Sequence, residues 1–163
     1  MKINTKGQEG FSLIELLIVV AIIGIIAAIA IPNLLASKRA ANEASAIGSL
    51  RTMTGAQAVY SVTKGAGEFG NLVALQGEGL IDSVLGAGTK SGYAYAATPF
   101  PPSITAAARF DSSAIPQSFG GVGSTGTRSF YTNESGVIYF NLTGVAPTCS
   151  ATSRVVSGGS PVK

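Results

Sequence analysis

The chain has 163 residues, enough for one domain with appendages but too few for two full domains. Charged residues make up 12% of it, the mean hydropathy is +0.39, and eleven Lys and Arg against eight Asp and Glu leave a net charge of +3. The bases are scattered and do not interleave with aromatics, so we do not expect a dedicated nucleic-acid surface.

The first predicted element is an apolar segment of membrane length, residues 11–31. Its only residues that are neither small nor apolar are Ser12 and Glu15. A helix of about twenty residues spans about 30 Å, which matches the hydrocarbon core of a bilayer. Lys2 and Lys6 precede the segment, so the positive-inside rule predicts a cytoplasmic N-terminus, with everything after residue 31 outside.

Three interpretations of this segment compete. A cleaved secretory signal needs a shorter apolar run and small residues at its far end, and Ala30-Ile31-Pro32 is a poor cleavage site. A plain single-span anchor fits the length but leaves Glu15 unexplained. The third interpretation places the cut before the apolar run, after Gly10.

Glu15 favours the third interpretation. A carboxylate near mid-membrane costs about 2.5–3.5 kcal/mol, and less near the interface, so such residues usually have a partner. Cutting after Gly10 would create a cation, the α-amine of Phe11, one turn from Glu15 on the same helix or on a neighbouring subunit. Opposite charges about 4 Å apart attract by about 4 kcal/mol at an effective dielectric of about 20. The alternative is a hydrated Glu15 at the level of the headgroups.

The residues Gly10-Phe11-Ser12-Leu13-Ile14-Glu15, with the apolar run to Pro32, resemble the class III signal of type IV pilins and type II secretion pseudopilins. The resemblance is nearly continuous over residues 10–35, and looser over residues 42–51. It implies that a prepilin peptidase cuts between Gly10 and Phe11 and methylates the new N-terminal Phe11. It also implies that Glu15, together with Phe11, docks subunits, and that Gly24 and Pro32 soften the helix.

The same resemblance implies the partners and the location. The chain would polymerise with itself through the inner-membrane assembly platform. It would start as a precursor anchored in the lipid of the bacterial inner membrane and end in an extracellular filament.

Pro32 lacks an N–H and crowds the carbonyl of Ala28, so we expect at least a kink there.

After Pro32 the helix is predicted to continue to residues 61–63. Ile47, Leu50 and Met53, and less regularly Val59 and Tyr60, suggest the face covered by the rest of the protein. The stretch Lys64-Gly65-Ala66-Gly67 is predicted to end the helix with a C-cap-like glycine. We therefore expect a leader over residues 1–10, a helix over 11–63 with an anchor over 11–31, and a loop and globular β domain over 64–163.

The C-terminal part is predicted to form a small antiparallel sheet. Residues 71–88 indicate a loop with a short helix around 79–85. Strands are expected at residues 93–96, 105–110, 129–132 and 137–140, and the last two flank Asn133-Glu134-Ser135-Gly136 as a hairpin. The predicted fold class is therefore α+β, a long N-terminal helix packed on about four short strands. From Cys149 onward we expect an exposed, mobile tail.

Several short patterns suggest other chemistry. The GxGxxG match at residues 121–126 leads into a probable strand instead of a helix, so we interpret it as a glycine loop. Asp111-Ser112-Ser113 and the 133–136 turn could offer oxygens to Ca²⁺ but lack dense ligand spacing, and plain turns are favoured. Asn133 and Asn141 begin N-glycosylation sequons, a pattern that often arises by chance.

We expect that the protein is not an enzyme and that it binds no metal or cofactor. The chain has no histidine for a Ser–His pair, and its carboxylates are too few and scattered to nominate an acid–base couple. Cys149 is the single cysteine of the chain, so it cannot form an intrachain disulfide. A disulfide between subunits is the alternative to an unpaired thiol.

The sequence therefore predicts the major subunit of a type IV pilus that serves adhesion, motility or DNA uptake. The alternative within the family is the major pseudopilin of a type II secretion system. The alternative of another class is a single-span anchored binding module outside the cytoplasm.

Overall fold

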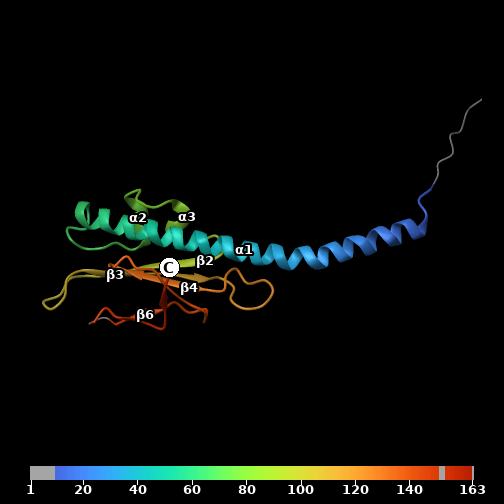
Figure 1. Cartoon of the computed structure of the whole chain (residues 1–163). Coiled ribbons are helices and arrows are strands. Elements are labelled where there is room, and N and C mark those ends of the chain that lie inside the picture. Colours follow the sequence, from blue (N-terminus) through green and yellow to red (C-terminus); the bar gives the residue numbers. More distant parts are fainter. Residues whose placement is uncertain (1–9, 151–152, 163) are drawn as a thin grey trace, which may run out of the picture. The chain divides into compact units, whose positions relative to one another are not determined.

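The computed structural model describes residues 10–150 and 153–162. The chain falls into two units, the first ending at Ala36 and the second running over Ser37–Lys163. A single helix, α1 (Leu13–Thr63), contributes residues to both units (Figure 1). Its end at Thr63 confirms the predicted limit. The predicted α+β fold is also confirmed, since the second unit packs its part of α1 on an antiparallel sheet.

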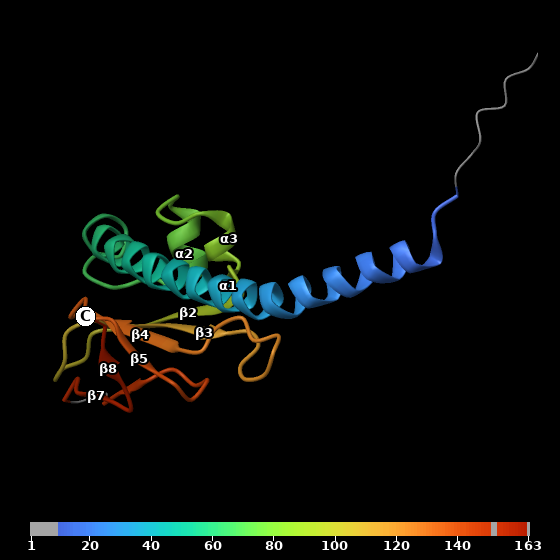
Figure 2. The ribbon, with the colours of Figure 1, turned by 45° about the vertical axis from the view of Figure 1, so that its right-hand side comes forward.

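The second unit holds the other elements, which lie on both sides of its part of α1 (Figure 2). The helices are α2 (Leu72–Gly77) and α3 (Ser83–Gly86). The strands are β1 (Thr89–Lys90), β2 (Tyr93–Phe100), β3 (Arg109–Pro116), β4 (Ser129–Asn133), β5 (Tyr139–Asn141), β6 (Thr148–Cys149), β7 (Val156–Ser157) and β8 (Ser160–Pro161). The main sheet runs β1-β2-β3-β4-β5-β8, and β6 and β7 form a separate pair. The strands β2, β4 and β5 lie where the sequence predicted strands, and β3 only overlaps a predicted one. β1 and β8 have two residues each, too short for a visible alternation.

The ladders of the sheet confirm the hairpin and correct one strand. Tyr131 pairs with Tyr139, and the turn lies between β4 and β5 as predicted. The prediction of a strand over residues 105–110 is wrong, because β3 begins only at Arg109 and pairs with β2 along eight residues. Alternate residues of β3 are buried, but they include Ser112 and Ala114, so the alternation is invisible as a hydrophobic pattern.

One face of α1 in the second unit closes the core. Ala46, Leu50 and Met53 are fully buried there with Tyr93 and Phe130 of the sheet. Ile47 and Tyr60 pack against this core as predicted, but Val59 is 48% exposed, so its assignment to the face is wrong. Residues three or four apart lie on the same face of a helix. Counted from Met53, this face continues through Ala56, Gln57 and Tyr60 and does not include Val59.

The segment after α1 is held by a side chain that hydrophobicity does not indicate. The amide of the fully buried Gln57 donates to the carbonyl oxygen of Gly70 (2.6 Å) and accepts from the Gly70 N–H (2.9 Å). Residues 64–67 end α1 as predicted, with positive φ at Ala66 (49°) and at Gly67 (94°).

Helix α2 lies where the sequence predicted only a loop. Asn71 caps it by accepting the N–H of Ala74 at 2.9 Å, and Leu75 is fully buried. The short helix predicted at residues 79–85 is shifted, since α3 begins after Asp82, which accepts the N–H of Leu85 at 2.8 Å. Both helices are shorter than two turns, so the capping residues carry more information than any periodicity.

A buried carboxylate joins α1 to the segment that leads into β4. Glu43 is 5% exposed and accepts from the Thr127 N–H and hydroxyl and from Nε of Arg128, each at 2.7 Å. The Arg128 guanidinium also lies over the rings of Phe130 and Phe140. Burial raises the pKa of Glu43, but the hydrogen bonds from Thr127 and Arg128 outweigh it, so the pKa lies below its ordinary value.

The C-terminal segment is more ordered than expected. β6, β7 and β8 belong to it, and Arg154 ties it to the sheet. The Arg154 guanidinium donates to Glu134 (2.6 Å) and to Asp111 (2.8 Å). Most of residues 153–162 are exposed as predicted, but the short strands and the contacts of Arg154 hold the segment against the sheet, which differs from the expected mobile tail.

We predict that Glu43→Gln lowers the free energy of unfolding by about 2 kcal/mol, because it weakens charge-assisted hydrogen bonds at a buried position. Unfolding of the detergent-solubilised protein, followed by tyrosine near-UV circular dichroism, would measure this loss. The exposed Glu68→Gln is the matched control.

The lowered pKa also fixes the pH dependence. The ionised Glu43 stabilises the fold fully above its unfolded pKa, and this contribution is lost as the pH falls through the lower folded value. The wild type should therefore lose stability below about pH 4.5 more steeply than Glu43→Gln. Equal slopes for the two proteins would contradict the assignment.

Candidate functional site

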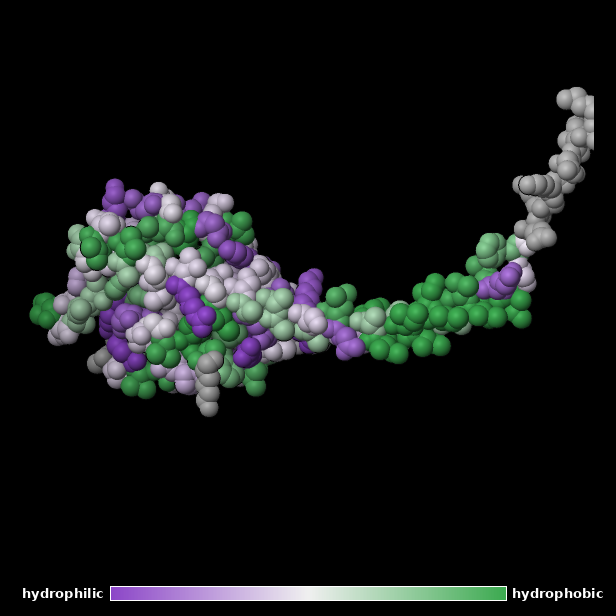
Figure 3. Space-filling view, turned by 45° about the horizontal axis from the view of Figure 1, so that its top comes forward, coloured by the Kyte–Doolittle hydropathy of each residue, from purple (hydrophilic) through white to green (hydrophobic). Residues whose placement is uncertain are grey.

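The first unit presents an apolar surface on every side of its helix. The large apolar side chains of residues 13–34 are between 49% (Val19) and 79% (Leu13) exposed. By length and composition this part of α1 could cross a membrane, and none of its most apolar stretch is buried. Figure 3 shows the apolar surface running along this helix. We call residues 13–36 of α1 the apolar rod.

An all-round apolar helix is stable only when something covers it. The rod differs in this from α1 in the second unit, where one face is buried in the core and the other is exposed. Covering must come from lipid or from other protein chains. The rod therefore has the properties of an interaction surface and not of a binding pocket.

The N-terminal end of the rod carries a capping-box pair, Ser12 and Glu15, of which the structure shows the bond to the Glu15 carboxylate. Helix α1 begins at Leu13, so Ser12 is its N-cap residue and Glu15 is the third residue of its first turn. A carboxylate oxygen of Glu15 accepts the Ser12 N–H at 3.0 Å, and the Ser12 carbonyl accepts the Leu16 N–H at 3.3 Å. The pattern Ser-x-x-Glu is the usual signature of this cap, and sequence reasoning did not use it.

The capping box gives Glu15 a local reason to sit at this position. A negative charge in the first turn also interacts favourably with the helix dipole. Neither effect supplies a full positive charge, and the sequence contains no Lys or Arg between Lys6 and Lys38. The hydrogen bond therefore satisfies the Ser12 N–H but leaves the charge of Glu15 without an opposite charge from this stretch of sequence.

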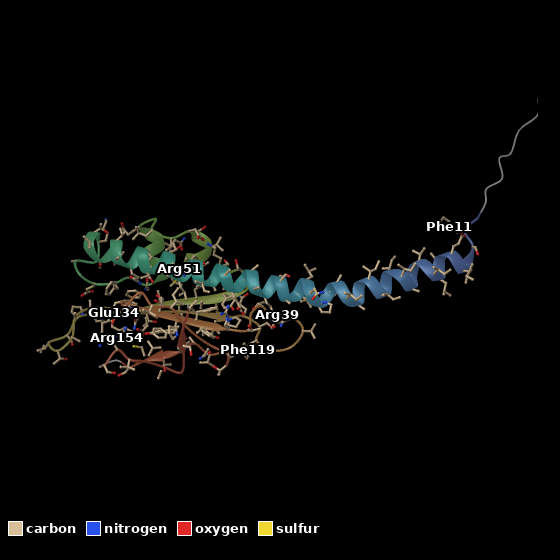
Figure 4. All side chains as sticks on the ribbon, in the orientation of Figure 1. Phe11, Arg39, Arg51, Phe119, Glu134 and Arg154 are labelled. Atoms are coloured by element: carbon tan, nitrogen blue, oxygen red, sulfur yellow. The ribbon has the colours of Figure 1, made fainter. Side chains whose placement is uncertain are left out.

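The predicted cleavage residues lie just outside the helix. Gly10, Phe11 and Ser12 precede α1 and are exposed, and Phe11 is 89% exposed (Figure 4). The structure thus brings Gly10, Phe11 and Glu15 together at the first turn. Their roles in cleavage, methylation and docking stay predictions.

Gly24 and Pro32 lie farther along the rod, inside a stretch that is helical throughout. A side chain at Gly24 would meet no atom within 4 Å, so no contact in the structure requires glycine there. Next to Pro32, the Asn33 side chain donates to the Ile29 carbonyl at 3.1 Å. A softening role for both residues stays a prediction.

The GxGxxG segment lacks the structure of a dinucleotide site. It is a loop between β3 and β4 that is bonded to α1, since Asn42 Nδ2 donates to the Thr125 carbonyl at 2.8 Å. A side chain at its last glycine, Gly126, would collide with the hydroxyl of Tyr93. The glycine is required by packing, and the interpretation as a structural loop agrees with this geometry.

The two segments considered for Ca²⁺ meet at one cation of the protein itself. The prediction of a plain turn at residues 111–113 is wrong, because these residues lie within β3. Asp111 and Glu134 both accept from Arg154, and Asp111 also accepts from the Tyr131 hydroxyl at 2.7 Å. Burial raises the pKa of Glu134, but the bonds from Arg154 outweigh it, and the pKa lies below its usual value. In the part of the chain that the structure describes, no group of three or more His, Cys, Asp or Glu side chains could hold a metal ion.

The structure also locates the two N-glycosylation sequons and the single cysteine. Asn133 is 2% exposed, and its Oδ1 accepts from the N–H and hydroxyl of Ser135, so this sequon is not accessible in the folded chain. Asn141 is partly exposed. Cys149 is a partly exposed free thiol whose Sγ lies 3.6 Å from Nδ2 of Asn133.

Comparison with known proteins finds a family motif that covers most of the rod and the residues before it. The family model described as the prokaryotic N-terminal methylation motif matches residues 5–31, which include Gly10, Phe11 and Glu15. Over these residues the chain has the N-terminal motif of type IV pilins and pseudopilins. This match covers the N-terminal part of the chain.

Pilus components and a secretion-system component are both among the similar proteins. The chain is 46% identical over 57 residues to the type IV wide pilus major component PilA4 of Thermus thermophilus, covering 35% of this chain and 44% of the relative. It is 44% identical over 87 residues to the type IV major fimbrial protein FimA of Dichelobacter nodosus, covering 52% and 53%. It is 33% identical over 58 residues to the type II secretion system core protein G of Escherichia coli, covering 36% and 40%.

The chain therefore matches about half or less of the length of these relatives. Their names describe pilus, fimbrial and secretion-system components and no enzyme. No solved structure matches the chain.

We predict that Glu15→Gln preserves the start of α1, whereas Glu15→Ala frays it by about 1 kcal/mol, because glutamine can still accept the Ser12 N–H. Amide hydrogen exchange over residues 12–16 of the purified precursor in detergent would measure the difference. Identical protection in both variants would show that the capping box does not set the start of the helix.

Proposed function

We propose that this chain is the major structural subunit of a type IV pilus. The observation that carries the proposal is the apolar rod, exposed on all sides, with a single carboxylate in its first turn and the family motif across it. The subunit is cut after Gly10, methylated at Phe11 and held in the membrane by residues 11–31. It then polymerises with the rods in the filament core and the second unit at the surface.

The energetics of the rod explain why the same surface serves both states. Burying about a dozen large apolar side chains at roughly 1.5–3 kcal/mol each amounts to about 20–40 kcal/mol relative to water. The subunit therefore never leaves lipid for water. Transfer from lipid to a filament core exchanges one apolar surrounding for another and carries little hydrophobic drive. Assembly then depends on an external motor, and return to the membrane is permitted.

Glu15 sets the contact between subunits under this proposal. Cleavage after Gly10 creates the Phe11 α-amine within a turn of the Glu15 carboxylate, and a neighbouring subunit can present its own amine to the same group. Attraction of about 4 kcal/mol at a separation of about 4 Å offsets the cost of the carboxylate in an apolar core. Subunits whose amine does not meet a carboxylate are disfavoured in the filament.

A pseudopilin of a type II secretion system is the second candidate. It is supported by the identity of 33% to core protein G, over nearly the same length of chain as the match to PilA4. The identities of 46% and 44% to the pilus and fimbrial relatives support the pilin. The single-span binding module of another class predicts an uncleaved monomer on the cell.

The test is to shear cells that express the chain, image the released material by electron microscopy and sequence its N-terminus. The pilin predicts long fibres whose subunits begin at methylated Phe11. A pseudopilin predicts cleaved subunits that stay with the cells and whose deletion blocks protein export. Uncleaved monomers would contradict both and favour the binding module.

We predict that Glu15→Ala and Glu15→Gln are both inserted and cleaved but yield few or no filaments. Glutamine keeps the capping hydrogen bond and removes only the charge, so it separates docking from helix capping. Fibre yield in the sheared fraction, against the amount of cleaved subunit in membranes, is the measurement. Normal piliation by Glu15→Gln would remove the charge-pairing argument.

A further inference from the structure

Four exposed apolar side chains gather at one end of the second unit. They lie in the β3–β4 loop (Phe119 at 44% and Val122 at 79% exposure) and in the segment after β5 (Leu142 at 65% and Val145 at 63%). The two segments are adjacent, because Ser129 pairs with Asn141 and a side chain at Gly144 would collide with the Phe119 ring. We call these four residues the end patch.

The end patch is fixed to the first turns of α1 in this unit. Arg39 Nη1 lies 3.5 Å from the Ser124 hydroxyl, and Asn42 Nδ2 donates to the Thr125 carbonyl at 2.8 Å. Figure 4 places Phe119 and Arg39 at the same end of the unit, and Glu134 and Arg154 toward the other end. The loop is therefore anchored at its base, while its tip at Val122 projects to solvent.

The chain enters the unit at this same end. Ser37 is the first residue of the second unit, and α1 passes from the rod into Lys38 and Arg39 without interruption. From residue 31 to Lys38 a helix advances about 10 Å, and the headgroup region on each side of a bilayer is about 5–8 Å thick. If residues 11–31 span the hydrocarbon core, the turn that holds the end patch starts at the membrane surface.

We propose that the end patch and the exposed Lys38 form a second, peripheral contact of the unassembled subunit with the surface of the bilayer. This inference rests on the proposed function, since it needs the rod to be inserted. Val122 and Phe119 enter the boundary between headgroups and acyl chains, and Lys38 contacts lipid phosphates. Exposed apolar side chains beside a basic residue are typical of such interfacial segments.

Lipid fits this surface better than a second copy of the chain. Lys38 is exposed and directly precedes Arg39, whose Nη1 lies 3.5 Å from the Ser124 hydroxyl in the loop of the patch, so the chain offers a positive charge to anionic lipid phosphates close to this loop. The position of the patch at the chain's entry point brings it to lipid in every anchored subunit, whereas contact with another copy requires assembly. The contact would hold the unit close to the bilayer until the subunit is extracted.

The test uses tryptophan as a reporter, since the chain has none. The variants Val122→Trp, Ile104→Trp and Ile23→Trp of the full chain are reconstituted in phosphatidylcholine vesicles, with or without phosphatidylglycerol, that contain brominated lipids. Ile104 is fully exposed in the loop between β2 and β3, at the opposite end of the sheet from the patch, and serves as the matched control. Ile23→Trp reports insertion of the rod.

We expect quenching of Val122→Trp to exceed that of Ile104→Trp by about twofold or more, because interfacial side chains sit within reach of the upper acyl chains. Phosphatidylglycerol should increase this quenching, and Lys38→Gln in the Val122→Trp background should abolish the increase.

Three outcomes would overturn the proposal. Quenching of Ile23→Trp with none at Val122→Trp would leave the anchor standing and remove the second contact. A shielded Val122→Trp that becomes exposed when the protein is diluted with lipid would assign the patch to a second copy. No quenching of Ile23→Trp would remove the inserted rod, and with it both this surface and the membrane anchor of the proposed function.

Discussion

The apolar rod is the constraint on which the rest of the structure depends. Helix α1 is one element with two surroundings, since its second part buries one face against the sheet and its first part buries none. The core of the second unit is formed by residues from Ala46 onward and does not include the rod. Under the proposed function, the rod can therefore exchange lipid for other subunits without a change in that core.

Glu15 is compatible with such an exchange because its surroundings can change with processing. In the full chain its carboxylate accepts a neutral N–H and sits at the positive end of the helix dipole. Under the proposed cleavage a full positive charge appears at Phe11, one residue before that N–H. The same carboxylate can then serve as a cap in the precursor and as half of an ion pair in the filament.

The sequence predicted the elements with strong patterns, namely the rod, the end of α1, the β4–β5 hairpin and the α+β class. It failed where polar or small residues carry the structure. Ser112 and Ala114 hide the alternation of β3, Asn71 and not periodicity marks α2, and Glu43 gives no hydrophobic signal although it joins α1 to β4. The tie from Arg154 to Asp111 and Glu134 joins residues far apart in the chain, which no local pattern can indicate.

The most direct measurement is the distance between the Phe11 amine and the Glu15 carboxylate in assembled material. Solid-state NMR of sheared fibres, made from a mixture of subunits labelled with ¹⁵N at Phe11 and subunits labelled with ¹³C at the Glu15 carboxyl, reports contacts between different chains. A dipolar coupling that places the two groups within about 4 Å of each other is the result we predict. A second sample, made of subunits that carry both labels, reports contacts within one chain as well. Well-formed fibres in which neither sample shows this coupling would contradict the pairing of the buried charge.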